Sequence, residues 1–258
     1  MADRVTLITG ASSGIGAELA RIFASNGHKT VLVARREDRL NQIADEIAAT
    51  GKTRPVVIAC DLKEPGTCDT IADKLSAMNA EVEIVVNNAG FGLFGNAVEM
   101  DRAEQLAMVD INVRVLTDLS LRFADSLIKH RGGMLNVGSI ASFLPGPRMA
   151  VYYASKAYVL SFTEAMRGEL GPKGVRVTAL CPGPVPTEFQ GRAGFVAGLD
   201  SAILNVSAPA VARAGYRGLM SNKRLVMPGV GVRMIPFLLR FAPRSMVLAS
   251  VARVQRKR

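Results

Sequence analysis

The sequence Thr9-Gly10-Ala11-Ser12-Ser13-Gly14-Ile15-Gly16 joins an apolar run at residues 5–9 to a stretch at residues 14–25 in which Ala, Leu and Ile recur at helical spacing. The apolar run predicts a buried strand, and the glycine-rich turn leads from it into a helix. At such a junction, small residues let the backbone approach a phosphate, and the helix N-terminus offers free N–H groups. The glycines alone would also fit a helix-entry turn with positive φ, so the strand and helix around them carry the prediction of a dinucleotide site.

The same alternation continues along the chain. Apolar runs predict strands at residues 30–34, 55–59, 83–87, 134–137 and 175–180, and amphipathic stretches predict helices at 37–49, 65–78, 101–129 and 152–170. After Cys181, prolines and glycines indicate a loop, followed by a helix at 209–220 and a short last strand at 224–227. Strands that alternate with helices favour a parallel sheet. We therefore expect an α/β fold, a doubly wound, mainly parallel Rossmann-type sheet with helices on both faces, as a single domain over residues 1–231. Residues 232–258 form a C-terminal extension that belongs to the same domain or lies peripheral to it.

Further motifs follow in a fixed order. They are the spacing Gly-x-x-x-Gly-x-Gly from Gly10, Asn87-Asn88-Ala89-Gly90 after the fourth strand, Asn112, Ser139 after the fifth strand, Tyr152-x-x-x-Lys156, and Pro182-Gly183-x-Val185-x-Thr187. In this order and spacing the chain resembles the short-chain dehydrogenase/reductase family, in its standard, non-extended branch. The resemblance runs from residue 5 to about residue 187.

The tyrosine and lysine also allow a physical argument. Residues four apart lie on one face of a helix, so the ammonium of Lys156 is expected near the phenol of Tyr152. A positive charge there would lower the phenol pKa from its usual value of about 10, as general acid–base catalysis requires. An isolated Tyr-x-x-x-Lys is more often a core tyrosine with a solvated lysine, so the other motifs carry this interpretation. Tyr153 is a rival proton donor, but Tyr152 has the family's spacing to the lysine and lies 13 residues after Ser139.

The resemblance also implies roles for individual residues. Ser139 would hydrogen-bond the substrate carbonyl, and Asn112 would help to hold a water that links Lys156 to solvent, completing the catalytic set with Tyr152. The residues that would bind the cofactor are Gly10, Ser12, Ser13, Gly14, Ile15, Gly16, Arg35, Asp61, Leu62, Asn88, Ala89, Gly90, Tyr152, Lys156, Pro182, Gly183, Val185 and Thr187.

The second predicted strand ends in Val33-Ala34-Arg35-Arg36, which indicates the cofactor. Enzymes that use NAD often place an acid here for the ribose 2′-hydroxyl, and none stands at Ala34. Arg35 is suited instead to the 2′-phosphate of NADP, with Arg36 the next candidate. The alternative is two solvated arginines at a helix start, where the dipole disfavours them. We therefore expect NADP(H), with Asp61 contacting the adenine by family likeness.

These motifs together predict an NADP(H)-dependent oxidoreductase that interconverts a carbonyl and an alcohol by hydride transfer. Apolar residues in the loop at 188–215 favour a small apolar ketone or acyl-type substrate; they are Phe189, Phe195, Val196, Leu199, Ile203 and Leu204. The alternative is a non-catalytic NADP-binding sensor or interaction protein on the same fold. A chain that retains both Tyr152 and Lys156 favours the enzyme.

Composition limits the other classes of function. The three cysteines are an odd number without Cys-x-x-Cys spacing, and neither His28 nor His130 has a second ligand at useful spacing, so no metal is expected. No signal peptide or membrane-spanning stretch is predicted, which favours a cytoplasmic protein. The resemblance implies a homodimer or homotetramer, paired through the helices at 101–129 and 152–170.

The charge is concentrated near the C-terminus. The net charge is +10, yet residues 189–258 hold 12 Lys or Arg against one acid, which leaves −1 for residues 1–188. Residues 222–258 hold nine Lys or Arg and no acid among many apolar residues, which is typical of helices that lie on anionic membranes. The alternative is that this apolar stripe covers the substrate pocket or a partner subunit. Aromatic residues are too few there to favour nucleic-acid binding, and none is expected.

Overall fold

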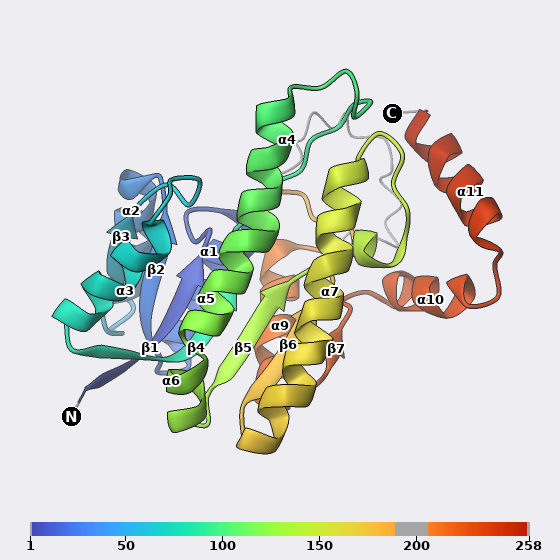
Figure 1. Ribbon diagram of the computed structural model, residues 1–258. Coiled ribbons are helices and arrows are strands. Elements are labelled where there is room, and N and C mark those ends of the chain that lie inside the picture. Colours follow the sequence, from blue (N-terminus) through green and yellow to red (C-terminus); the bar gives the residue numbers. More distant parts are fainter. Residues whose placement is uncertain (1, 189–205, 257–258) are drawn as a thin grey trace.

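One parallel sheet organises the chain in a computed structural model, which describes residues 2–188 and 206–256 (Figure 1). Across the described residues its strands lie in the order β3-β2-β1-β4-β5-β6-β7, and every adjacent pair is parallel. The strands are β1 (Asp3–Thr9), β2 (Lys29–Ala34), β3 (Val56–Ala59), β4 (Ala80–Asn87), β5 (Gly133–Val137), β6 (Arg176–Leu180) and β7 (Leu225–Val226). The predicted α/β, doubly wound fold is confirmed.

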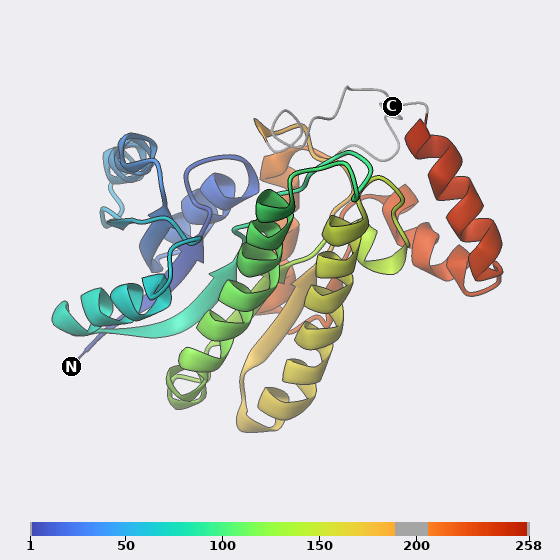
Figure 2. The ribbon, with the colours of Figure 1, turned by 45° about the horizontal axis from the view of Figure 1, so that its top comes forward.

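Helices cover both faces of this sheet (Figure 2). One face packs against α1 (Gly14–Ser25), α2 (Glu37–Ala49) and α9 (Ala208–Met220). The other packs against α3 (Thr67–Ala77), α5 (Leu116–Arg122), α6 (Ala124–Lys129) and α7 (Ala150–Leu170). Neighbouring residues of β1 point to opposite cores, Leu7 to the second and Ile8 to the first, and both are fully buried. A strand that is buried on both faces is a nearly continuous apolar run. The apolar run at residues 5–9 therefore predicts β1 from the sequence alone.

The single helix predicted at 101–129 is wrong in detail. Its residues form α4 (Arg102–Val109), a π-helical stretch η1 (Asp110–Val115), α5 and α6. The backbone leaves the helix at Phe123, where φ is −97° and ψ is 5°. The amphipathic pattern predicts one continuous helix, but contacts with the sheet redirect the chain. Leu127 of α6 is fully buried, and Ser126 donates a hydrogen bond to the Val82 carbonyl.

The ends of β1 and β4 are joined by side chains. The Thr9 hydroxyl accepts hydrogen bonds from the backbone N–H groups of Asn88 (3.1 Å) and Ala89 (3.0 Å) and donates to the carbonyl of Val86. The Asn88 amide donates to the carbonyls of Thr9 (3.0 Å) and Gly10 (3.2 Å). These strands flank the point where the strand order reverses, which is where open α/β sheets bind ligands.

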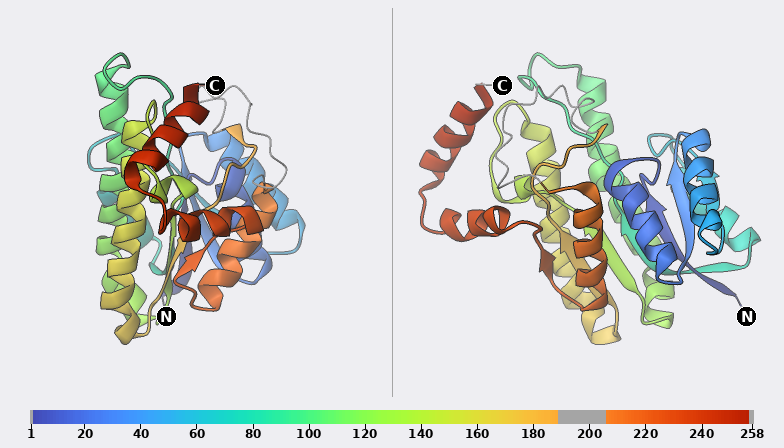
Figure 3. Two further views of the ribbon diagram at one scale, coloured as in Figure 1. Left: turned by 90° about the vertical axis from the view of Figure 1, so that its right-hand side faces the viewer. Right: turned by 180° about the vertical axis from the view of Figure 1, so that it is seen from behind.

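The C-terminal residues form an arm of two helices, α10 (Val230–Leu239) and α11 (Arg244–Arg256), which projects from the end of β7 (Figure 3). We name residues 230–256 the C-terminal arm. Pro243 lies between the two helices, and Pro236 lies inside α10. The fully buried Val232 anchors the first turn of α10. Among the described residues, no helix is long and apolar enough to cross a membrane.

The loop geometry predicts opposite effects for two Gly→Ala substitutions. A Cβ at Gly16 would lie 2.2 Å from the Gly10 carbonyl oxygen and 2.5 Å from Asn88 Nδ2. Gly16→Ala should therefore lower the free energy of unfolding by about 1–3 kcal/mol and weaken dinucleotide binding. Gly168, exposed within α7, meets no atom within 4 Å, so Gly168→Ala should raise stability by about 1 kcal/mol. Chemical denaturation measures both, and equal effects at the two positions would refute this account of the loop.

Candidate active site

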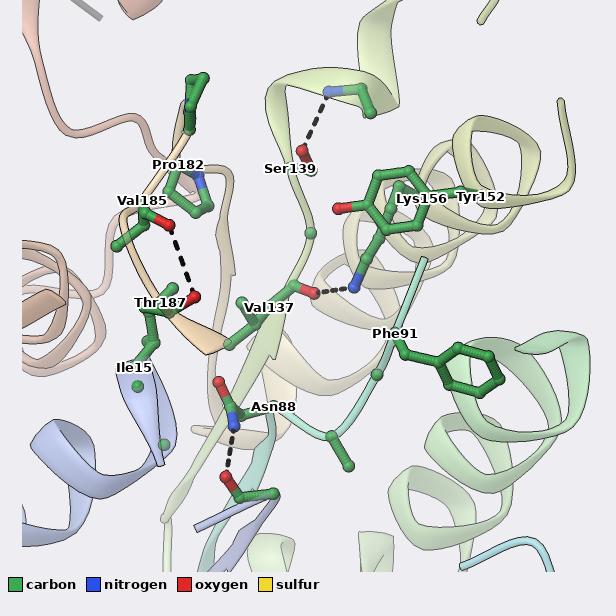
Figure 4. Close-up of a pocket in the computed structure, with 18 of the residues that line it drawn as sticks. Ile15, Asn88, Phe91, Val137, Ser139, Tyr152, Lys156, Pro182, Val185 and Thr187 are labelled. Atoms are coloured by element: carbon green, nitrogen blue, oxygen red, sulfur yellow. Dashed lines mark hydrogen bonds between the residues drawn. The ribbon is translucent and has the colours of Figure 1, made fainter. Parts of the chain in front are cut away.

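A cavity of about 780 Å³ opens at the carboxyl ends of the central strands (Figure 4). Its wall contains every residue predicted to bind the cofactor and every predicted catalytic residue except Asn112. It extends from Arg35, at the end of β2, past the glycine loop and Ser139 to the C-terminal arm. The sequence motifs therefore come together in one site.

The glycine loop forms a cradle that only small residues allow. Gly10 and Gly14 have φ values of 65° and 55°, which L side chains rarely adopt. A Cβ at Gly10 would lie 2.8 Å from the Asn88 amide, and a Cβ at Gly14 would lie 3.2 Å from the Thr187 methyl. Ser13 does not cap α1 through its side chain, so the first N–H groups of that helix remain available. This cradle fits the pyrophosphate of a dinucleotide.

Two arginines stand at the far end of the cavity, each beside an acid. Arg35 Nη1 lies 3.6 Å from Asp61 Oδ2, with half of the arginine side chain exposed. Arg36 donates to Ser12 Oγ (3.3 Å) and to Glu188 Oε2 (2.8 Å), and this pairing lowers the pKa of Glu188. Of the two, Arg35 is held by the longer contact and is the freer to meet an anionic ligand.

The side chains of Ser139 and Tyr152 lie close together in the cavity wall, as Figure 4 shows. Ser139 follows β5 and caps the short helix η2 (Ile140–Phe143), where its hydroxyl accepts a hydrogen bond from Ala141 N–H at 3.1 Å. Burial raises the pKa of Tyr152 to about 12, and the Ser139 side chain opposes that rise.

Lys156 lies one helical turn after Tyr152 but does not point at the phenol. Its Nζ donates to the Val137 carbonyl at 2.9 Å and lies 5.9 Å from the centre of the tyrosine ring. Lys156 is 5% exposed, and burial lowers its pKa to about 8. The predicted lowering of the Tyr152 pKa by Lys156 is therefore wrong for this arrangement, because burial dominates both groups.

Asn112 lies behind the cavity wall and holds two of the backbone segments that form this wall. The residue belongs to the π-helical stretch and is 1% exposed. Its amide contacts both the N–H and the carbonyl of Phe91, at 3.1 and 3.0 Å, and donates to Ser155 Oγ at 3.0 Å. Ser155 in turn donates to the Tyr152 carbonyl. Asn112 thus fixes the chain after β4 against the turn of α7 that carries Tyr152 and Lys156.

The C-terminal arm supplies a wall that the motifs did not predict. Val232, Ile235, Ser250, Val251, Val254 and Gln255 all line the cavity. Gln255 donates to the Tyr153 hydroxyl at 3.0 Å, and Arg148 donates to the Gln255 carbonyl at 2.9 Å, so α11 is tied to the start of α7. The sequence signal for this wall was the apolar stripe within residues 222–258. Covering of the substrate pocket was the alternative interpretation of that stripe. The predicted substrate-loop residues from Phe189 to Leu204 lie outside the described residues.

Comparison with known proteins identifies the family. The model of the family described as short chain dehydrogenase matches residues 4–194. Sulfoacetaldehyde reductase 2 of Chromohalobacter salexigens is 37% identical over 188 residues, covering 72% of this chain and 74% of the relative. The 11-beta-hydroxysteroid dehydrogenase 1A of Arabidopsis thaliana is 34% identical over 238 residues, covering 86% and 67%. The chain belongs to the short-chain dehydrogenase family, which is a family of oxidoreductases.

Solved structures share the fold over nearly the whole chain. A short-chain dehydrogenase from Sphingobium yanoikuyae in complex with NADPH is 30% identical, with a TM-score of 0.83 and 92% of each chain covered. The bulky-bulky ketone specific alcohol dehydrogenase from Comamonas testosteroni is 27% identical, with a TM-score of 0.75 and 93% and 95% of the two chains covered.

The buried Lys156 predicts a pH dependence of stability. Its pKa of about 8 in the folded protein lies below the ordinary value of 10.5, so between these pH values the unfolded chain binds more protons. Stability therefore rises with pH in this window, and the cost of burying the cation is complete only below pH 8. The unfolding free energy of the wild type relative to Lys156→Met should grow by on the order of 3 kcal/mol from pH 7 to 10.5.

Denaturant unfolding of both proteins across this range is the measurement. Because both proteins contain Tyr152 and the cysteines, the difference between them reports the titration of Lys156 together with its interaction with Cys181. Parallel pH profiles would show that Lys156 keeps its ordinary pKa when folded.

Proposed function

We propose that this chain is an NADP(H)-dependent oxidoreductase that interconverts an apolar ketone and its alcohol. The observation that carries the proposal is that Tyr152 and Ser139 lie together in the wall of a cavity whose other end is a dinucleotide cradle. A bound nicotinamide would supply or accept the hydride. The chain's own residues would bind the substrate oxygen and move one proton.

In the direction of reduction, a substrate carbonyl oxygen would accept hydrogen bonds from Ser139 and Tyr152, which polarise it. Tyr152 then gives its phenolic proton to the oxygen. With a pKa of about 12 the phenol is protonated at neutral pH, so the proton to be transferred is present. Lys156 Nζ lies 5.9 Å from the centre of the Tyr152 ring, and its pKa of about 8 lets it gain or lose a proton near neutral pH and so restore the phenol. In oxidation of the alcohol, the same groups act in reverse.

Several features support an apolar substrate. The cavity wall near Tyr152 includes Phe91, Leu144 and Met149, and the arm adds Ile235, Val251 and Val254. The names of the relatives range from a sulfoacetaldehyde reductase to a hydroxysteroid dehydrogenase and a bulky-ketone alcohol dehydrogenase, so the family alone does not choose among substrates. The apolar wall favours the bulky carbonyl compounds over the anionic aldehyde.

Tyr152→Phe tests the chemistry. The substitution removes the transferable proton and little volume, so kcat should fall by about three orders of magnitude or more while the affinity for NADPH changes less than about twofold. Tyr153→Phe is the matched control, because it removes the hydroxyl that Gln255 contacts and should alter KM more than kcat. Both are followed by NADPH absorbance over a panel of cyclic and long-chain ketones. Loss of kcat in Tyr153→Phe alone would reassign the donor.

Arg35→Asp tests the cofactor preference. Replacing this cation by a carboxylate would repel a 2′-phosphate and accept a hydrogen bond from a ribose 2′-hydroxyl. The ratio of kcat/KM for NADPH to that for NADH should fall by about two orders of magnitude. Lys52→Asp makes the same charge change at an exposed residue outside the cavity wall and should leave the ratio unchanged. An unmoved ratio in Arg35→Asp would place the 2′-phosphate elsewhere, with Arg36 next.

A further inference from the structure

The outer surface of the C-terminal arm is unusually apolar. Of the fifteen large apolar residues that are exposed in the described chain, eight lie on the arm, and of these only Val254 also lines the cavity: Val230, Met234, Phe237, Leu238, Phe241, Met246, Leu248 and Val254. Phe241 is 76% exposed, and its ring meets that of Phe237 edge to face at 5.5 Å. An exposed apolar patch of this kind marks a surface that contacts something other than water.

The same surface carries positive charge that no acid balances. Arg233, Arg240, Arg244 and Arg253 are exposed, and no described acid forms an ion pair with any of them. Elsewhere in the described chain, arginines such as Arg21, Arg114 and Arg122 do pair with acids. Three further cations, Arg256, Lys257 and Arg258, end the sequence. Two copies of this face brought together would repel each other, so a second copy of the chain is a poor occupant.

We propose that the C-terminal arm docks on an anionic lipid bilayer. The exposed phenylalanines, leucines and methionines would enter the boundary between headgroups and acyl chains, and the arginines would contact the phosphates. Helices of 10 and 13 residues that cannot span a membrane are suited to lie in its plane. Since the inner side of the arm lines the cavity, docking would hold the cavity beside the bilayer, where apolar substrates concentrate. The proposal does not depend on the reaction catalysed.

The test is co-sedimentation of the full chain with phosphatidylserine-containing and pure phosphatidylcholine vesicles at about 0.1 M salt. The wild type should bind the anionic vesicles and not the neutral ones. Phe237→Ser/Phe241→Ser and Arg240→Glu/Arg244→Glu should each weaken this binding about tenfold or more. Lys52→Glu/Lys173→Glu, which makes the same net charge change at exposed residues away from the arm, should bind within about twofold of the wild type.

Point variants are preferable to a truncation near Gly231, because truncation also removes the buried Val232 and the cavity wall. Circular dichroism and turnover of a water-soluble ketone confirm that each variant is folded. The proposal fails if the wild type ignores anionic vesicles even at low salt, or if the control pair loses as much binding as the arginine pair. It also fails if light scattering shows that the phenylalanine variant only converts a dimer to a monomer, with vesicle binding unchanged.

Discussion

The hydroxyl of Thr9 and the amide of Asn88 hold together the two strand ends on which the whole site is built. Between them they bind the backbone at five points around the carboxyl ends of β1 and β4. Asn88 Nδ2 also packs so closely that Gly10 and Gly16 have no room for a Cβ. The two glycines and the asparagine therefore depend on each other. Because strand order reverses here, this one cluster fixes both the cradle and the direction in which the cavity opens.

A second set of buried polar groups holds α7 against the sheet. These groups lower the stability of the fold but fix the positions of the side chains on α7. Lys156 is almost fully buried with its Nζ on the Val137 carbonyl, Ser142 Oγ donates to the Lys156 carbonyl, and Asn112 reaches α7 through Ser155. Burying a cation opposes folding, which the lowered pKa of Lys156 expresses. Apolar residues would stabilise this layer better. They would not place an ammonium and a phenol one helical turn apart at the cavity wall.

Much of this architecture could be predicted from the sequence because its signals are local. Apolar runs such as residues 5–9 reflect burial on both faces of the sheet, and the motif residues meet because the ends of parallel strands share one edge. The contacts of Asn112 with Phe91 and Ser155, and the break at Phe123, depend on packing between distant elements, which periodicity does not encode. The direction of the Tyr152 pKa was missed for the same reason. The spacing of four residues places Lys156 near Tyr152 on the helix. The direction of its ammonium is set by the hydrogen bond to the Val137 carbonyl, which the spacing does not reveal.

The cavity is lined by two parts of the chain, the region that the family model matches and the C-terminal arm, and these two parts have different structural requirements. The family model ends at residue 194, so the cradle, Ser139 and Tyr152 lie within the shared region, while the C-terminal arm lies beyond it. Hydride and proton transfer need fixed geometry, which a sheet and a buried helix provide. Recognition of the substrate needs only a wall of suitable shape and polarity. Among the described residues, side-chain hydrogen bonds from Arg148 to Gln255 and from Gln255 to Tyr153 tie the arm to the body at this wall, whereas buried polar groups hold α7. A ligand that moved the arm would therefore change the substrate end of the cavity more directly than the end formed by the glycine loop.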